Sequence, residues 1–184
     1  IDITTSEFYE RLNCCNEIPK TSQITPNRFY EKYQEKTKNG DQVIVITMSS
    51  KLSGTYNSAV IAAEDFKDQV YVVDSMTVAA GERLLCEYAL NVLIDNLTIE
   101  EIIDKLNTQK QKINIMAIVN TLKYLKKGGR LSSTSAFAGE FLSIKPILTI
   151  SNGIIKDIGK ALGTKKAHNL LNKLIANKGG IDFD

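Results

Sequence analysis

Short apolar runs alternate with helical patterns along most of the chain. Three runs rich in β-branched residues, at 43–47, 70–73 and 113–119, have the length and composition of buried strands. Segments with apolar residues at helical spacing lie around them, at 4–12, 26–39, 57–64, 81–92, 98–106 and 122–127. Strands that alternate with helices are typical of βα units. The pattern predicts an α/β fold with a mainly parallel sheet and flanking helices.

The pattern changes near Lys145. Two strand-like runs, 146–150 and 154–158, flank Asn152-Gly153, which is a strong hairpin signal. An amphipathic helix follows from Lys165 and ends before Gly179-Gly180. We therefore expect two domains: an α/β domain over residues 1–143 and the beginning of an incomplete α+β domain over residues 144–184.

Several helix ends are marked by their sequence. Thr4 or Thr5 can cap the first helix, and Pro26 suits the first turn of the second. Thr98, followed three residues later by Glu101, has the pattern of a capping box.

The hydroxyl-rich stretch Ser49–Tyr56 follows the first predicted strand and precedes a helix. Ligands bind at this position in open α/β sheets, because the helix start offers unpaired N–H groups and a partial positive charge. Gly54 allows a close approach of the backbone to a ligand, and Ser50 and Ser53 offer hydroxyl donors for a carboxylate or phosphate. Thr21 and Ser22 join this site if their loop folds over the same edge. The alternative is that the hydroxyls only cap the helix.

Composition excludes some classes of protein. The 184 residues are 43% hydrophobic and 24% charged with a net charge of +2, as in ordinary globular proteins. No basic block with interleaved aromatic residues supports nucleic-acid binding, and no apolar stretch is long enough to span a bilayer. Three cysteines, two of them adjacent, match neither a disulfide framework nor a zinc motif, so we expect a reducing, cytoplasmic compartment. The chain begins at Ile1 without an initiator Met, which suggests a fragment.

No catalytic constellation or metal-binding cluster is visible. The single histidine, His168, lies in the middle of the last predicted helix, where we interpret it as a solvated residue. Asp74 ends the second strand, where it is either a base or, more simply, a hydrogen-bond partner in the loop. Arg130 follows two glycines and can turn back to pair with a carboxylate or phosphate, including one on a partner protein.

Taken together, the motifs resemble the DegV family of bacterial lipid-binding proteins. They run in the family's order along most of the chain: Asp2-Ile3-Thr4 with Glu7-Phe8-Tyr9, Pro19–Gln23, Ser49–Tyr56 with Ser58-Ala59, Val73–Ser75, Tyr124–Arg130 and Lys145–Leu148.

The resemblance implies a non-catalytic protein without a cofactor that holds one long-chain fatty acid, such as palmitate, in a buried tunnel. Hydroxyls bind its carboxylate, and a separate ATP-dependent kinase subunit receives the acyl group and forms acyl phosphate for phospholipid synthesis. Carried onto this chain, Thr21 matches the loop threonine, Ser53 or Ser50 the loop serine, and Arg130 an arginine at the pocket mouth. Transient membrane contact is compatible with this role.

The chain departs from the family pattern at several points. Ile24 replaces a proline, and 160–166 lacks an arginine common in the family. Both ends of the family's length are missing, and the family's head-group histidine is expected beyond residue 184. Two alternatives remain: an enzyme that acts on a small anionic metabolite, with the same loop as cradle and Asp74 as base, and a structural or regulatory module.

Overall fold

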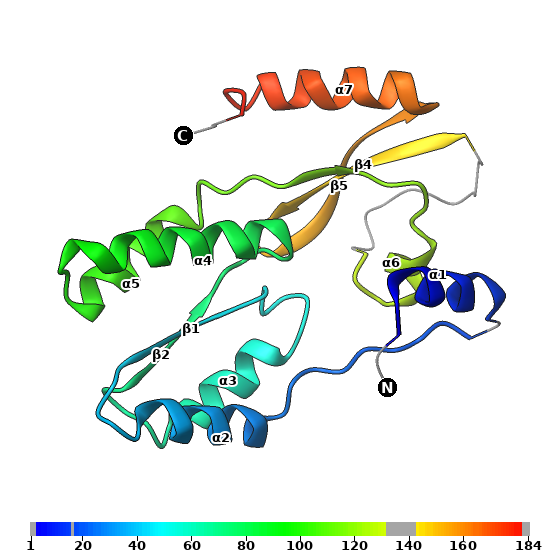
Figure 1. Ribbon diagram of the computed structural model, residues 1–184. Coiled ribbons are helices and arrows are strands. Elements are labelled where there is room, and N and C mark those ends of the chain that lie inside the picture. The colour runs from blue at the N-terminus through cyan, green and yellow to red at the C-terminus, as the bar shows by residue number, and fades with distance from the viewer. Residues whose placement is uncertain (1–2, 16, 132–142, 182–184) are drawn as a thin grey trace.

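The computed structural model describes residues 3–15, 17–131 and 143–181, so Asp2 of the first family motif lies outside the described residues. Helices and strands follow one another in a mixed α/β order (Figure 1). They are α1 (Thr5–Cys14), α2 (Pro26–Thr37), β1 (Val43–Thr47), α3 (Thr55–Ala63), β2 (Val70–Asp74), α4 (Ala80–Val92), the 3₁₀ helix η1 (Leu93–Asp95), α5 (Ile99–Gln109), β3 (Met116–Ile118), α6 (Lys123–Lys127), β4 (Ile144–Ser151), β5 (Ile154–Leu162) and α7 (Thr164–Ala176).

The first sheet consists of β1 and β2, which pair in parallel from Val43↔Val70 to Thr47↔Asp74. Alternate residues of each strand face opposite sides of the sheet. Val43 and Val70 face α2 and α3, whereas Ile46 and Val73 face α4 and α5. The sheet therefore lies between two helical layers (Figure 1), as a buried parallel sheet requires. The predicted parallel βα arrangement is confirmed for these strands.

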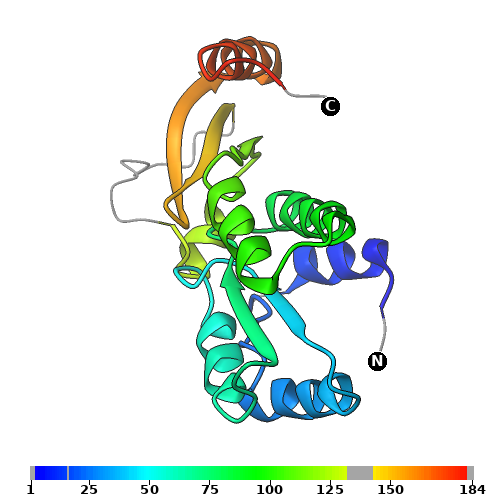
Figure 2. The same cartoon turned by 90° about the vertical axis from the view of Figure 1, so that its left-hand side faces the viewer.

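The second sheet is antiparallel, in the order β3-β4-β5. The predicted third strand is shorter than expected and pairs with β4 through Ala117↔Leu148, so its placement in the parallel sheet was wrong. Periodicity indicates a strand but not its partner, which accounts for the error. Figure 2 shows α7 at the top, and the β4–β5 hairpin running from it down to the level of α4 and α5. The domain boundary after residue 143 stays a prediction, because β3 pairs across it and residues 132–142 lie outside the described residues.

The β4–β5 hairpin and the helix caps follow the sequence closely. Asn152 and Gly153 have φ values of 51° and 77°, the positive angles that a two-residue hairpin turn needs. Thr4 caps α1 by accepting from the Glu7 amide. Thr98 and Glu101 form the expected capping box at α5. These local predictions are confirmed, because each depends on residues close together in the chain.

Charge is unevenly divided between the two parts of the chain. Residues 113–184 contain eleven Lys and Arg residues against four Asp and Glu, whereas residues 1–112 contain twelve against seventeen. In the described part, the basic excess covers α6, β5 and α7, and the helices with an acidic excess beside the parallel sheet are α4 and α5. The small net charge therefore conceals two oppositely charged regions.

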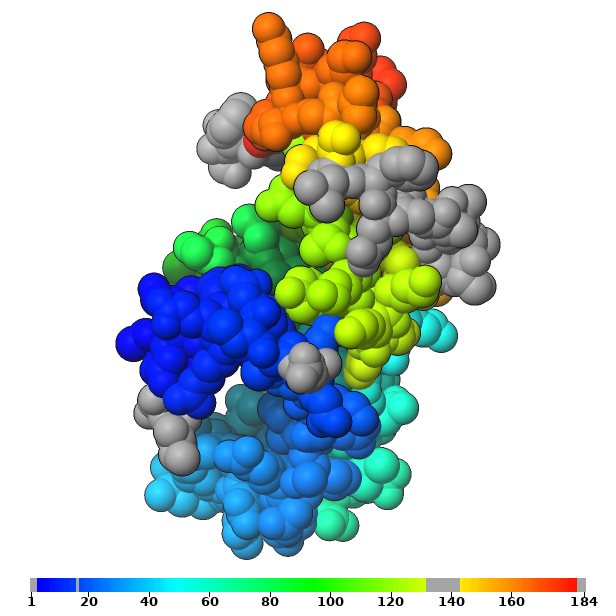
Figure 3. Space-filling view, turned by 90° about the vertical axis from the view of Figure 1, so that its right-hand side faces the viewer, coloured from blue at the N-terminus to red at the C-terminus, as the bar shows by residue number. Residues whose placement is uncertain are grey.

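Two further features concern the surface. Helix α1 lies beside the segment around α6, which Figure 1 and the space-filling view of Figure 3 both show. Among the described residues, no helix combines the length and the apolar character needed to cross a bilayer.

Candidate functional site

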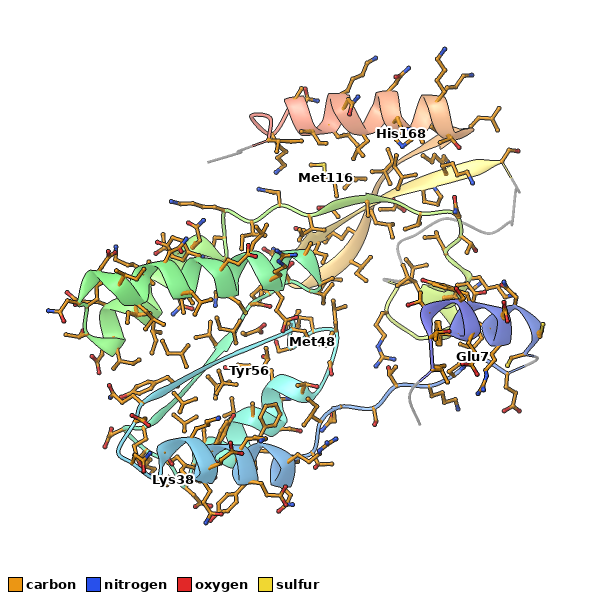
Figure 4. The ribbon with its side chains drawn as sticks, viewed as in Figure 1. Glu7, Lys38, Met48, Tyr56, Met116 and His168 are labelled. Atoms are coloured by element: carbon orange, nitrogen blue, oxygen red, sulfur yellow. The ribbon has the colours of Figure 1, made fainter. Side chains whose placement is uncertain are left out.

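The loop between β1 and α3 forms the centre of the candidate site. It leaves the carboxyl end of β1 at Met48 and enters α3, whose first turn contains Tyr56 (Figure 4). No side chain caps α3, and its N-cap is Gly54. An uncapped helix start leaves N–H groups and a partial positive charge at this end. The loop therefore has the polarity that suits an anion.

Ser50 is the predicted serine of the β1–α3 loop whose hydroxyl makes no hydrogen bond among the described residues. Its amide donates to Asp74 Oδ1 at 3.2 Å, while its side chain makes no hydrogen bond to the described residues. The Ser53 hydroxyl, in contrast, lies 2.9 Å from Thr55 Oγ1 and accepts from the Thr55 amide at 3.2 Å. Since one of these two hydroxyls donates to the other, the pair retains one free O–H for a ligand.

The loop that carries Thr21 and Ser22 folds over α3, and a ligand-binding role for these two residues stays a prediction. Gln23 Nε2 donates to the Ser58 hydroxyl at 2.9 Å, and the Ile24 amide lies 3.4 Å from Thr55 Oγ1. Thr21 and Ser22 are exposed and make no side-chain hydrogen bond to the described residues. The contacts of Gln23 and Ile24 with α3 thus bring the unbonded hydroxyls of Thr21 and Ser22 to the edge of the molecule where α3 begins.

The space beside Gly54 is filled by the protein itself. A Cβ at this position would lie 1.8 Å from Gln23 Oε1. Gly54 has ordinary backbone angles, with φ −70°, so the position needs glycine for room rather than for conformation. The sequence predicted that a ligand approaches the backbone closely at Gly54. In the structure, the Gln23 side chain makes this approach instead.

Arg130 reaches the same loop from the end of α6. Its Nε donates to the Leu52 carbonyl at 3.3 Å, and its Nη1 donates to the Gly128 carbonyl. The Arg130 side chain thus turns back toward the loop, while its pairing with a carboxylate or phosphate stays a prediction. The guanidinium group remains exposed, so it can still meet an anion.

Asp74 is engaged in the loop structure. Its Oδ1 accepts from the amides of Ser50 at 3.2 Å and Met76 at 2.9 Å. Its backbone carbonyl accepts from Lys110 Nζ at 3.1 Å. Burial lowers the pKa of Lys110, and the charge of Asp74 opposes that shift. These contacts favour the loop-partner interpretation of Asp74 over its use as a base.

Several buried hydroxyl residues at the ends of β1 and β2 were not among the predicted site residues. Thr47, Ser49, Ser75 and Thr77 are all buried there. Within the described residues, the Thr47 and Thr77 hydroxyls are the buried side-chain polar atoms that lack a hydrogen-bond partner. Their position at strand ends was a usable signal, because this is where the candidate site was expected.

His168 lies on α7, far from the labelled Met48 and Tyr56 in Figure 4. It is exposed in the middle of that helix. Within the described residues, no group of three or more His, Cys, Asp or Glu side chains could hold a metal ion.

Comparisons with known proteins agree with these motifs. The model of the DegV family of uncharacterised proteins matches residues 1–181. A fatty acid-binding protein of Thermotoga maritima is 40% identical over 171 residues, covering 91% of this chain and 59% of that protein.

Solved structures share the fold. A DegV family protein from Thermus thermophilus, described as binding fatty acid, has a TM-score of 0.88 at 32% identity, over 96% of this chain and 63% of that one. The fatty acid kinase B3 protein of Streptococcus pneumoniae, loaded with linoleic acid, has a TM-score of 0.83 at 23% identity, over 95% of this chain and 63% of that one. The chain spans about three fifths of the length of these relatives. Because the family model covers nearly every residue, the chain belongs to the DegV family.

Proposed function

We propose that this chain forms the carboxylate-binding part of a fatty-acid carrier. The observation that carries the proposal is the convergence of unbonded hydroxyls from two loops, Ser50 and Thr21 with Ser22, at the uncapped start of α3. Relatives described as fatty acid-binding proteins supply the ligand class. Thr21, Ser22, Ser50 and Ser53 hold the carboxylate, and Arg130 lies at the rim.

The chemistry suits binding without reaction. Each buried CH₂ of an acyl chain contributes about 0.8 kcal/mol, so a long chain gives tight binding without catalytic groups. The carboxylate needs hydrogen-bond donors, because a buried and unpaired charge is very costly. A tunnel between two domains holds the acyl chain in this proposal, and the remainder of a full-length protein supplies part of its wall.

The carrier presents its ligand to a separate kinase. Neutral hydroxyl donors leave the carboxylate nucleophilic, so that one of its oxygens attacks the γ-phosphorus of ATP, releases ADP and becomes acyl phosphate. The family resemblance supports this partnership. The carrier itself supplies no group to the phosphoryl transfer.

The first test is extraction of lipid from the purified full-length protein, followed by mass spectrometry. We expect a long-chain fatty acid at about one per protein. Ser50→Ala should weaken fatty-acid binding about tenfold, because a hydrogen bond to a charged group contributes about 1.5–3 kcal/mol. Ser6→Ala, an exposed serine of α1, makes the same chemical change elsewhere and should leave the affinity unchanged. A lipid-free protein that binds no added fatty acid contradicts the proposal.

The second test separates carrier from enzyme. The loaded protein is incubated with ATP, with and without a fatty acid kinase subunit, and hydroxylamine traps any acyl phosphate as the hydroxamate. We expect product only with the kinase present. Product from the carrier alone would favour the enzyme alternative.

A further inference from the structure

Ser49 is the most highly connected residue of the loop, although the predicted ligand set omits it. It is completely buried. Its amide donates to the Thr77 carbonyl at 2.8 Å, and its own carbonyl accepts from the amides of Leu52 at 3.0 Å and Ser53 at 3.2 Å. Its hydroxyl accepts from the Lys51 amide at 3.2 Å. Ser49 therefore fixes the course of the backbone through Ser53.

The Ser49 hydroxyl also crosses to the second sheet. It donates to the Gly153 carbonyl at 2.8 Å, in the turn between β4 and β5, 104 residues away in sequence. Its one proton is used in this bond, so Ser49 cannot also donate to a ligand. Its role differs in this respect from that of Ser50, whose hydroxyl is unbonded among the described residues.

The turn is shaped to receive this bond. Gly153 is buried with φ +77°, and a Cβ added to it would lie 2.5 Å from Ser49 Oγ and 3.2 Å from Lys51 Cγ. The loop and the turn are therefore in close contact at Gly153. A positive φ does not by itself mean that the space beside a glycine is filled. Gly40 has φ +85°, yet a Cβ added to it would meet no atom within 4 Å.

We propose that the Ser49–Gly153 contact is a positioning device through which the β4–β5 hairpin holds the Ser50–Ser53 loop ready for a carboxylate. Ser49 is a positioning residue that does not touch the ligand. The inference rests on the proposed function, and it makes affinity for the carboxylate depend on docking of the hairpin. The acyl chain lies outside this contact, so only the head-group contribution to binding should change.

The experiment compares palmitate with hexadecanol, which has the same chain length but no carboxylate, by displacement of a fluorescent fatty acid from the full-length protein. We expect Ser49→Ala to weaken palmitate binding about tenfold and hexadecanol binding less than about twofold. Thr37→Val is the matched control, because Thr37 is also a buried hydroxyl that donates to a backbone carbonyl, that of Tyr33 at 2.8 Å. It should change neither affinity.

A second variant tests the contact from the other side while keeping the Ser49 hydroxyl. Gly153→Ala should also weaken palmitate selectively, and Gly40→Ala should not, although both place alanine at a positive φ. The double variant Ser49→Ala/Gly153→Ala should bind palmitate no more weakly than Ser49→Ala alone, because the clashing oxygen is gone.

The outcomes are separable. Unchanged palmitate affinity in both single variants, or equal loss of palmitate and hexadecanol, overturns the positioning role while leaving the proposed function intact. A wild-type protein that binds neither ligand overturns the proposed function and this inference with it.

Discussion

Among single residues, Gly54 shows how a side chain takes a space that the sequence suggested for a ligand. Gly54→Ala places a Cβ 1.8 Å from the Gln23 amide oxygen. Because that amide is the free end of a flexible side chain, it should swing away and lose its hydrogen bond to Ser58. We expect destabilisation of about 1 kcal/mol, measured by urea unfolding.

A double-variant cycle checks this explanation. Gln23→Ala removes the same hydrogen bond, so Gly54→Ala in the Gln23→Ala background should cost almost nothing more. Additive losses would mean that Gly54 is needed for another reason.

The sequence identified the hydroxyl-rich loop but not the state of each hydroxyl. Ser49 and Ser50 are adjacent and chemically identical, yet one hydroxyl is bonded to Gly153 and the other is unbonded among the described residues. The difference depends on a contact 104 residues away, which local spacing does not encode. Arg130 was easier to anticipate, because two glycines next to it allow the chain to turn back.

At the level of elements, Tyr33 links α2 to α3. Its hydroxyl donates to the Ala59 carbonyl at 3.2 Å, and burial raises its pKa to about 12. Since the pKa is higher in the folded state than in the unfolded state, the folded protein retains the proton between pH 10 and 12 while the unfolded chain loses it. The contribution of this pKa difference to the free energy of unfolding is complete below pH 10 and is lost as the pH rises toward 12.

Tyr33→Phe tests this linkage. At pH 8 we expect the variant to be about 1 kcal/mol less stable because it lacks the hydrogen bond. The difference from the wild type should shrink above pH 10, because only the wild type carries the titrating group. Denaturant unfolding at pH 8, 10 and 11 measures it, and a constant difference across these pH values would contradict the explanation.

The capping box of α5 gives a second prediction at this scale. Thr98 accepts from the Glu101 amide at 3.3 Å, and Glu101 accepts from the Thr98 amide at 2.8 Å. Thr98→Ala should reduce the free energy of unfolding by about 1 kcal/mol. Thr108→Ala, at an exposed position inside the same helix, is the control and should have little effect.

Elements defined by neighbouring residues were predictable, and their partners were less so. The capping box and the Asn152-Gly153 hairpin each depend on a few consecutive residues and were found as expected. The short strand β3 was recognised, but its pairing with β4 was not, because an apolar run fits either a parallel or an antiparallel neighbour.

The whole molecule combines two sheets of different type with opposite excess charge. Net charge and composition concealed this division, since +2 overall is the difference between a basic part and an acidic part. At pH 7 and low salt, we expect the chain to bind cation-exchange and anion-exchange resins alike. Moderate salt should elute the chain from both resins, because salt screens the interaction between their charges. Failure to bind either resin would mean that the two regions neutralise each other at the surface.

This separation of charge gives the molecule a permanent electric dipole. A charged body that approaches within roughly a Debye length, about 8 Å at physiological salt, exerts a torque on such a molecule before the two surfaces touch. An anionic body would meet the side of α6, β5 and α7 first, and a cationic one the side of α4 and α5. The encounter is then a guided rotation instead of a random search, and raising the ionic strength should slow it.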